Sequence, residues 1–170
     1  ILTFSLREKG VGGTISEHVF RRALNAGSIN ARAGFRTRTD TWQESMRTRI
    51  RRATPEDFEG IVRLVPTEEE LFRIHPKGEH PFSEEQLRKL AEVRHEFTVA
   101  ELNGSVAGFA NLYDFEADRW VFIGNVVVSE HCRGQGLGRR LVTHMTRTAF
   151  DKYAVPQVRI SVFSDNVPAL

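Results

Sequence analysis

The sequence predicts a mixed α/β domain, with a central, mostly antiparallel sheet that has helices on both faces. Three observations support this fold class. Apolar runs with the pattern of strands are interspersed with segments whose apolar residues recur every three or four positions, as in amphipathic helices. An Asn-Gly pair separates two of the strand-like runs, which indicates a tight antiparallel hairpin. The chain has 170 residues, of which 40% are hydrophobic, enough for one domain with a sizeable core.

Residues 1–45 differ from the rest in composition. They contain seven Lys/Arg against four Asp/Glu, glycine-rich stretches and no long aliphatic run. This predicts a poorly ordered basic extension that precedes a domain at 46–170. The domain itself has seventeen basic against eighteen acidic residues, so its charge gives no reason to expect a nucleic-acid partner. A nucleic-acid accessory role would have to depend on residues 1–45, and we consider it unlikely.

The cysteine count, the lengths of the apolar runs and the histidine spacing bear on cellular location and metal binding. Cys132 is the single cysteine, so no intrachain disulfide can form and a reducing, cytoplasmic location is expected. No apolar run approaches the roughly 20 residues that span a bilayer, so we expect no membrane partner. The start of the chain lacks the pattern of a signal peptide. The six histidines show no ligand spacing, and we predict no metal site.

The first strand and helix of the domain follow Met46. Residues 47–52 alternate like a half-buried strand, with the arginines expected on the solvated face. A helix should then begin at Thr54, which can cap it. Pro55 suits the first helical position, and Asp57 lies three residues after the cap, as in a capping box.

Two more helices and a hairpin come next. Residues 67–74 predict a short helix, and Ser83 with Gln86 repeats the capping signature at the start of another helix. Strands are predicted at 97–102 and 105–115, joined by the Asn-Gly turn.

The last elements surround a glycine-rich loop. Residues 120–128 form a nearly continuous apolar run, which is typical of a central strand, and Gly124 indicates a bulge. A helix is predicted from about Gly136 to Tyr153, and a final strand at 158–163. The buried stripe of the helix has a spacing of four and consists of Leu137, Leu141, Met145 and Ala149.

The loop has glycines at 134, 136 and 138, which bring backbone amides close to a ligand without obstruction by Cβ atoms. Together with the unpaired N–H groups at the start of the next helix, they predict a phosphate cradle, to which Arg133, Arg139 and Arg140 can add contacts. A dinucleotide fingerprint would need glycine at 139, where the chain has arginine. A Walker loop would need Gly-Lys followed by Ser or Thr, which the loop lacks. Both nucleotide-binding interpretations are therefore weakened. A plain turn without a ligand is the other alternative.

Residues Arg133 to Gly138 resemble the R/Q-x-x-G-x-G/A coenzyme A loop of the GNAT N-acetyltransferase superfamily. Residues 126–128 resemble that family's fourth strand, whose backbone pairs with pantetheine, and Asn166 with Ala169 resembles the start of a later coenzyme-facing helix. The resemblance covers 46–170 and implies acetyl-CoA as donor and an amine as acceptor. The coenzyme-binding residues that it implies are Val126, Val127, Val128, Arg133, Gly134, Gln135, Gly136, Leu137, Gly138, Arg139 and Asn166.

The catalytic residues follow the family pattern less well. Many relatives place a glutamate on the fourth strand, but residues 120–128 contain no carboxylate. Tyr113, Asp114 and Glu116 are therefore candidate bases, and Asn125 is a candidate for orienting a water molecule. The family's general-acid tyrosine would follow the Asn166 motif, beyond Leu170. We expect more chain there, with the family's final elements, or a partner that supplies them.

The function expected from the resemblance is acetyl transfer from acetyl-CoA to a primary amine, attacked directly in a ternary complex. The acceptor is a small molecule or a peptide, and a homodimer is compatible with the sequence. Acidic residues in 66–95 and in the turn 114–119 suit a cationic amine. The alternative is a non-catalytic acyl-CoA sensor or interaction module, which the absence of a carboxylate from 120–128 favours.

Overall fold

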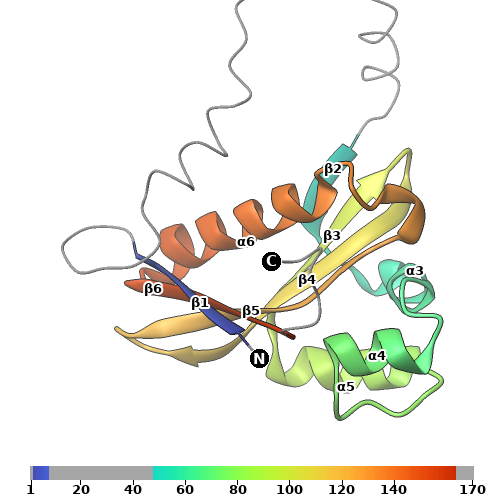
Figure 1. Cartoon of the computed structure of the whole chain (residues 1–170), viewed down its shortest axis with the longest axis horizontal. Helices are drawn as coiled ribbons and strands as arrows, with labels where there is room; N and C mark the ends of the chain where they lie inside the picture. Colours follow the sequence, from blue (N-terminus) through green and yellow to red (C-terminus); the bar gives the residue numbers. More distant parts are fainter. Residues whose placement is uncertain (1, 8–47, 164–170) are drawn as a thin grey trace, which may run out of the picture. The chain divides into compact units, whose positions relative to one another are not determined.

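The computed structural model describes residues 2–7 and 48–163 (Figure 1). In this part of the chain a six-stranded sheet has the order β1-β6-β5-β4-β3-β2. Only β5 and β6 are parallel, and the other neighbours are antiparallel. The strands are β1 (Leu2–Arg7), β2 (Thr48–Arg52), β3 (His95–Leu102), β4 (Ser105–Glu116), β5 (Trp120–Val128) and β6 (Gln157–Val162). The predicted mixed, mostly antiparallel fold is confirmed.

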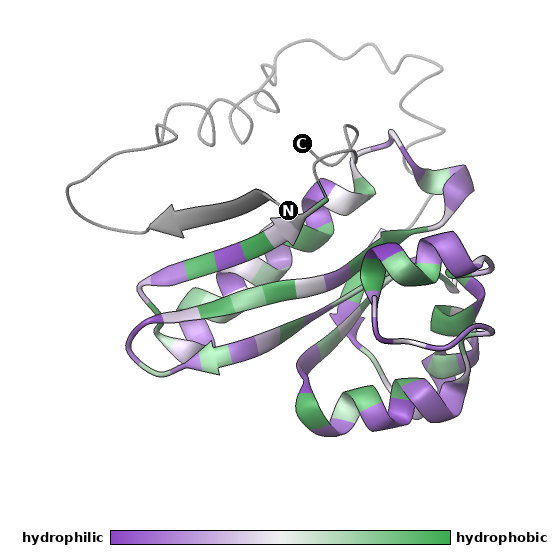
Figure 2. Cartoon of the chain, turned by 60° about the horizontal axis from the view of Figure 1, so that its bottom comes forward, coloured by the Kyte–Doolittle hydropathy of each residue, from purple (hydrophilic) through white to green (hydrophobic). Residues whose placement is uncertain are grey.

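The helices lie in two layers (Figure 1). Helices α3, α4 and α5 cover one face of the sheet and α6 covers the other. Figure 2 shows both hydrophobic and hydrophilic residues on the helices, as expected for elements with one face against the sheet. The helical segments are η1 (Pro55–Asp57), α3 (Phe58–Arg63), α4 (Glu68–Ile74), α5 (Glu84–Val93), η2 (Glu130–Cys132) and α6 (Leu137–Tyr153). Within the described residues, no helix has the length and apolar character to cross a bilayer.

Local sequence signals account for where these elements begin. The Ser83 hydroxyl accepts a hydrogen bond from the Gln86 amide at 3.3 Å, and Asp57 accepts one from the Thr54 amide at 2.8 Å. Both helix starts are therefore as predicted. At the hairpin, Asn103 and Gly104 have φ values of 52° and 82°, the left-handed conformation that the Asn-Gly pair predicts.

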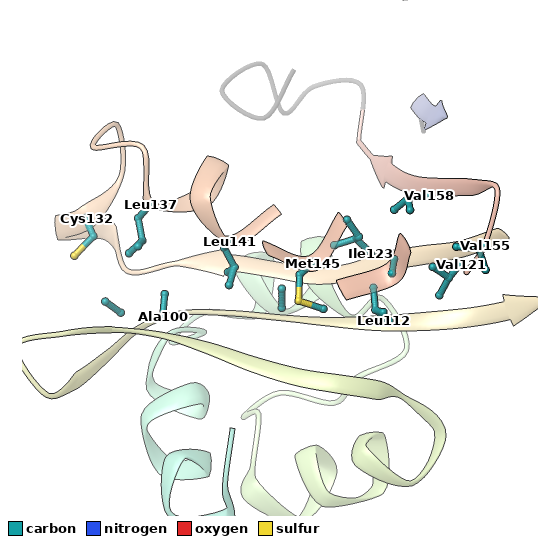
Figure 3. Packing of buried hydrophobic residues seen from close by; sticks show 13 residues of the cluster. Ala100, Leu112, Val121, Ile123, Cys132, Leu137, Leu141, Met145, Val155 and Val158 are labelled. Atoms are coloured by element: carbon teal, nitrogen blue, oxygen red, sulfur yellow. The ribbon is translucent and has the colours of Figure 1, made fainter. Parts of the chain in front are cut away.

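Two apolar clusters hold the layers together. On the α6 side, the predicted stripe packs against β3, β4 and β5 (Figure 3). Leu141, Met145 and Ala149 are fully inaccessible. On the other side, α3, α4 and α5 pack on Phe97, Val99 and Phe109. This second cluster fixes α4 near β5, where the candidate site lies.

Two features of the fold differ from the sequence analysis. Residues 1–45 were predicted to be poorly ordered, but Leu2–Arg7 forms the edge strand β1, which pairs with β6. The rest of that extension lies outside the described residues. The arginines of 47–52 were expected on a solvated face, but Arg51 is only 24% exposed. Its guanidinium donates to Asp57 at 2.6 and 2.7 Å and to Glu101 at 2.6 Å.

The Arg51 network predicts a measurable effect on stability. We expect Arg51→Gln to lower the free energy of unfolding by about 2 kcal/mol at pH 7, because Asp57 is buried and would lose its cation. The hydrogen bond from Arg51 is the main reason why the pKa of Asp57 lies below its usual value. The stabilisation is therefore present above about pH 4 and is lost as the pH falls through the lowered pKa.

Urea unfolding at pH 7 and at pH 3 tests this prediction. The difference between wild type and Arg51→Gln should shrink at the lower pH. Arg63→Gln is the control, because Arg63 pairs with Glu59 on the surface and both side chains are 69% exposed. Equal stability of the two variants at pH 7 would show that the network contributes nothing.

Candidate active site

The loop between β5 and α6 has the geometry that its glycines predict. Gly134 and Gly136 have φ values of 73° and 80°, in the left-handed region that side chains disfavour. A Cβ atom added at either position would meet no heavy atom within 4 Å. Gly138 has no such φ, and its added Cβ would lie 3.6 Å from a methyl group of Val128, an ordinary contact. The first two glycines therefore shape the loop and leave open space beside it.

The N-terminus of α6 gives this open space a positive potential. Gly136 is the N-cap residue, so no side chain caps the first turn, and the turn contains no acidic residue. The first amides of a helix lack intrahelical partners, and the helix dipole adds about half a positive charge there. A seventeen-residue helix that begins in this way is a suitable binding site for an anion such as a diphosphate.

The side chains of the loop mostly support its shape. Arg133 donates to the Val128 carbonyl at 3.1 Å and to the Glu70 carboxylate at 2.8 Å, so it ties the loop to α4. Gln135 donates to the His131 carbonyl at 2.8 Å. Arg139 is exposed at the start of α6, and its side chain is available to an incoming anion.

The apolar residues predicted to bind the coenzyme have buried or half-buried side chains. Val127 and Leu137 are 7% and 6% exposed and belong to the two apolar clusters. Val126 and Val128 are half-buried and pack against the α6 side. These residues can therefore contact a ligand mainly through their backbone groups. Asn166 lies outside the described residues.

Strands β5 and β6 separate partway along their length. They pair in parallel from Val121 with Val158 to Ile123 with Ile160. Beyond this point β6 continues to Val162 by pairing with β1 alone. In the described part of the chain, residues 124–128 of β5 therefore have no partner strand on the β6 side. Their backbone N–H and C=O groups form an edge that leads directly into the glycine loop.

A bulge interrupts β5 at the start of this edge. Phe109 pairs with Val127 and Asn111 pairs with Gly124, so β5 has one extra residue opposite β4. Asn125 lies in the bulge with a φ of 51°, one residue after the predicted position at Gly124. Its side chain is buried, accepts a hydrogen bond from Asn111 at 2.8 Å and donates one to the Ile74 carbonyl at 2.8 Å. Asn125 therefore joins the end of α4 to β5.

Tyr113 lies beside this bulge. The Arg94 guanidinium carbon is 4.0 Å from the centre of its ring, and the centre of the Phe122 ring is 5.3 Å away. A Cβ atom added at Gly124 would be 2.7 Å from the Tyr113 ring, so the absence of a side chain at Gly124 allows this packing. Of the predicted catalytic residues, Tyr113 and Asn125 are thus brought together.

Glu116 lies elsewhere. It pairs across the β4–β5 hairpin with Trp120, and its carboxylate forms an ion pair with Arg119. Asn125 is five residues further along β5, a separation of roughly 16 Å at 3.3 Å per residue. Asp114 is exposed and has a φ of 49°. The structure therefore does not bring Glu116 to the bulge.

Two residues near the bulge had no signal in the sequence. His75 follows Ile74 at the end of α4, and its pKa is lowered, mainly by burial and then by the charges of Arg94 and Lys77. Asn111 is fully buried, and its Oδ1 atom has no hydrogen-bond partner among the described residues. His75 lies near Asn125 because α4 packs on β5, a contact between residues far apart in the chain, and Asn111 because β4 pairs with β5. Within residues 2–7 and 48–163, no group of three or more His, Cys, Asp or Glu residues is placed so that it could hold a metal ion.

Comparisons with known proteins agree with this geometry. The sequence profile of the Acetyltransferase (GNAT) family matches residues 61–170. The chain is similar to a putative acetyltransferase from Agrobacterium tumefaciens str. C58, with 25% identity, a TM-score of 0.55 and coverage of 71% of this chain and 85% of that one. It is also similar to Ard1 from Thermoplasma volcanium, with 24% identity, a TM-score of 0.57 and coverage of 72% of this chain and 76% of that one. A third similar structure is a transcriptional regulator from Bacillus halodurans C-125, with 20% identity, a TM-score of 0.57 and coverage of 72% of this chain and 87% of that one. No curated protein sequence matches.

Proposed function

Since the chain belongs to the acetyltransferase (GNAT) family, we propose that it moves an acetyl group from acetyl-CoA to a primary amine while both substrates are bound. The acceptor is a small molecule or a peptide. One observation supports this proposal above all: the unpaired edge of β5 leads directly into a loop with left-handed glycines at the start of α6. An extended donor with amides and a diphosphate matches both features.

The loop residues fit the diphosphate of coenzyme A. The space beside Gly134 and Gly136 is open, and the amides at the start of α6 have no side-chain cap. Amides from residues 134–139 would hold the diphosphate, and the exposed Arg139 would add a charged contact. Arg133 has a different role in this proposal, because its bonds to Val128 and Glu70 set the position of the loop.

The edge of β5 fits the pantetheine arm. Residues 124–128 present backbone groups with the spacing of a strand, and the amides of pantetheine can pair with those that are free, since the Val128 carbonyl already accepts from Arg133. The thioester supplies the activated acetyl group. Backbone N–H groups near the bulge would stabilise negative charge on the carbonyl oxygen during attack by the amine. Holding both reactants in one place supplies a further part of the rate.

A proton must leave the acceptor, because an alkylammonium ion has no lone pair for attack. His75 is the residue that we propose for this role. Its lowered pKa keeps the imidazole neutral at pH 7, and it directly follows Ile74, whose carbonyl is bonded to Asn125. Tyr113 is the second candidate, beside the same bulge. Asn125 acts as a positioning residue, and Glu116 has no role in this proposal.

Several of the acidic residues expected to attract a cationic acceptor already have partners. Glu70 pairs with Arg133, Glu69 pairs with Arg73 at 3.1 Å, and Glu116 pairs with Arg119. These ion pairs neutralise much of the negative charge near α4 and the hairpin. The acceptor therefore need not be a cationic amine, and an amine screen should include neutral and anionic amines as well.

The role of His75 predicts a change in the pH profile. We expect His75→Gln to lower kcat about tenfold at pH 7, less than for a fully enclosed base, because water can carry the proton to solvent. Wild-type activity should persist below the ordinary histidine pKa of about 6.5, since the pKa of His75 is lowered. His144→Gln is the control on α6. A wild-type profile retained in His75→Gln would exclude His75 as the base.

A screen for free thiol release with acetyl-CoA and a broad amine panel tests the proposed function. Thiol release that depends on one class of amine supports acetyl transfer. The second candidate is an acyl-CoA-binding module without catalysis, favoured by the absence of a carboxylate from β5. This candidate predicts that the chain binds the coenzyme and that no amine in the panel causes thiol release.

A further inference from the structure

A cavity lies beside β3, where this strand extends past the end of β2. Strand β2 pairs with β3 only from Leu102 to Thr98, so residues 95–97 of β3 extend past the last β2 pair. A cavity of about 410 Å³ lies here, lined by residues of η1, α3, α5, β3 and the end of α6. Its volume is within the range of sites for small molecules. The cavity does not include the glycine loop. Lys152, which lines it, lies fifteen residues beyond Leu137 along α6, or roughly 22 Å.

The charged groups of this cavity are mainly cationic. Arg52, Arg94 and Lys152 line it, and Glu96 is the carboxylate among the lining residues. Glu96 is already engaged, because its Oε1 atom accepts a hydrogen bond from the Tyr153 hydroxyl at 3.0 Å and forms an ion pair with Lys152. Among the described residues, Arg52 and Arg94 form no ion pair, although Arg52 interacts electrostatically with Glu96 and Arg94 with Asp114. The three cations of the lining outnumber its single carboxylate.

Arg94 has a donor that the chain does not satisfy. Its Nη1 atom is buried and has no hydrogen-bond partner in the described part of the structure. Burial is the main reason why the pKa of Arg94 is lowered, and the charges of Tyr113 and Asp114 offset only part of this effect. This donor is covered by the protein, so the cavity meets Arg94 through its other atoms, and the charge of Arg94 still acts on an anion bound there.

Apolar residues complete the lining, although most of the exposed lining surface is polar. Phe58 and Phe97 are both buried, with ring centres 6.4 Å apart, and they line the cavity together with Pro55 and Ala91. The charge of the lining therefore favours a ligand with an anionic group. Guanidinium groups match the planar geometry of a carboxylate, to which they can donate two parallel hydrogen bonds.

We propose that this cavity binds a small carboxylic acid, with the carboxylate on Arg94 and Arg52. The site is separate from the coenzyme loop, and the proposal does not depend on acetyl transfer. Arg94 also contacts Tyr113 beside the bulge, so a ligand here would touch a residue that borders the proposed reaction centre.

An NMR titration of the full chain with two matched probes tests the site. Phenylacetate carries the carboxylate, and 2-phenylacetamide has nearly the same shape without the charge. We expect saturable shifts at the amides of Ala91 and Phe97, with phenylacetate bound at least tenfold more tightly, a preference of about 1.4 kcal/mol or more. Arg94→Gln and, independently, Arg52→Gln should remove this preference. Arg63→Gln, on the surface of α3, should keep it.

Three results would overturn the proposal. The first is the absence of saturable shifts with acetate, benzoate, phenylacetate and 3-phenylpropionate up to about 10 mM. The second is equal binding of phenylacetate and its amide by the wild type. The third is displacement of phenylacetate by acetyl-CoA, because the two sites are separate and both ligands should bind at once.

Discussion

Replacing both left-handed glycines, Gly134→Ala with Gly136→Ala, should weaken acetyl-CoA binding about 100-fold. Each alanine would have to adopt a φ of 73° or 80°, at a cost of about 1 to 2 kcal/mol per residue. The loop would escape this strain by changing its conformation, and its amides would no longer converge. In addition, each new Cβ atom would project into the open space that the diphosphate is proposed to occupy.

Gly138→Ala is the matched control for this prediction. It is the same chemical change in the same segment, but at a residue without a left-handed φ, and the added Cβ atom would make an ordinary contact with Val128. Titration calorimetry should show a Kd for Gly138→Ala within about threefold of wild type. A double variant that binds as tightly as Gly138→Ala would mean that the loop conformation does not determine binding.

Asn125→Ala should lower the free energy of unfolding by about 3 kcal/mol. The substitution would leave the Asn111 amide and the Ile74 carbonyl without their partner, both near the core. It would also place an alanine at a φ of 51°. The Asn125 side chain fixes the end of α4, which His75 directly follows. We therefore also expect kcat/KM of Asn125→Ala to fall more than that of His75→Gln.

The hairpin turn supplies the control for Asn125. Asn103 has nearly the same φ, 52°, but it is exposed. Asn103→Ala should therefore report the backbone strain alone, about 1 kcal/mol. The difference between the two alanine variants in urea unfolding measures the two buried hydrogen bonds. If the variants were equally destabilised, Asn125 would not be holding α4 in place.

The features that sequence analysis predicted well depend on neighbouring residues. Ser83 and Gln86 mark a helix start three residues apart, and Asn103-Gly104 marks a turn within two residues. The glycine loop is equally local, because its left-handed residues and the helix that follows form one continuous segment. Short-range backbone preferences were sufficient to place these elements.

The features that it missed depend on contacts between distant residues. Asn125 bonds to a carbonyl 51 residues earlier, and this contact brings His75 close to the bulge. Arg51 bonds to Glu101, 50 residues away, and is therefore only 24% exposed, less than the strand pattern indicated. The strand β1 gains its partner only at the other end of the described chain, in β6. Composition and periodicity give no information on such pairings.

Binding of acetyl-CoA to the full chain, followed by amide NMR, is the most direct test of the proposed site. The account predicts saturable binding, with the largest shifts at the amides of residues 134–139 and smaller ones along 124–128 of β5. Binding without shifts in the glycine loop, or no binding at millimolar acetyl-CoA by a folded chain, would contradict it.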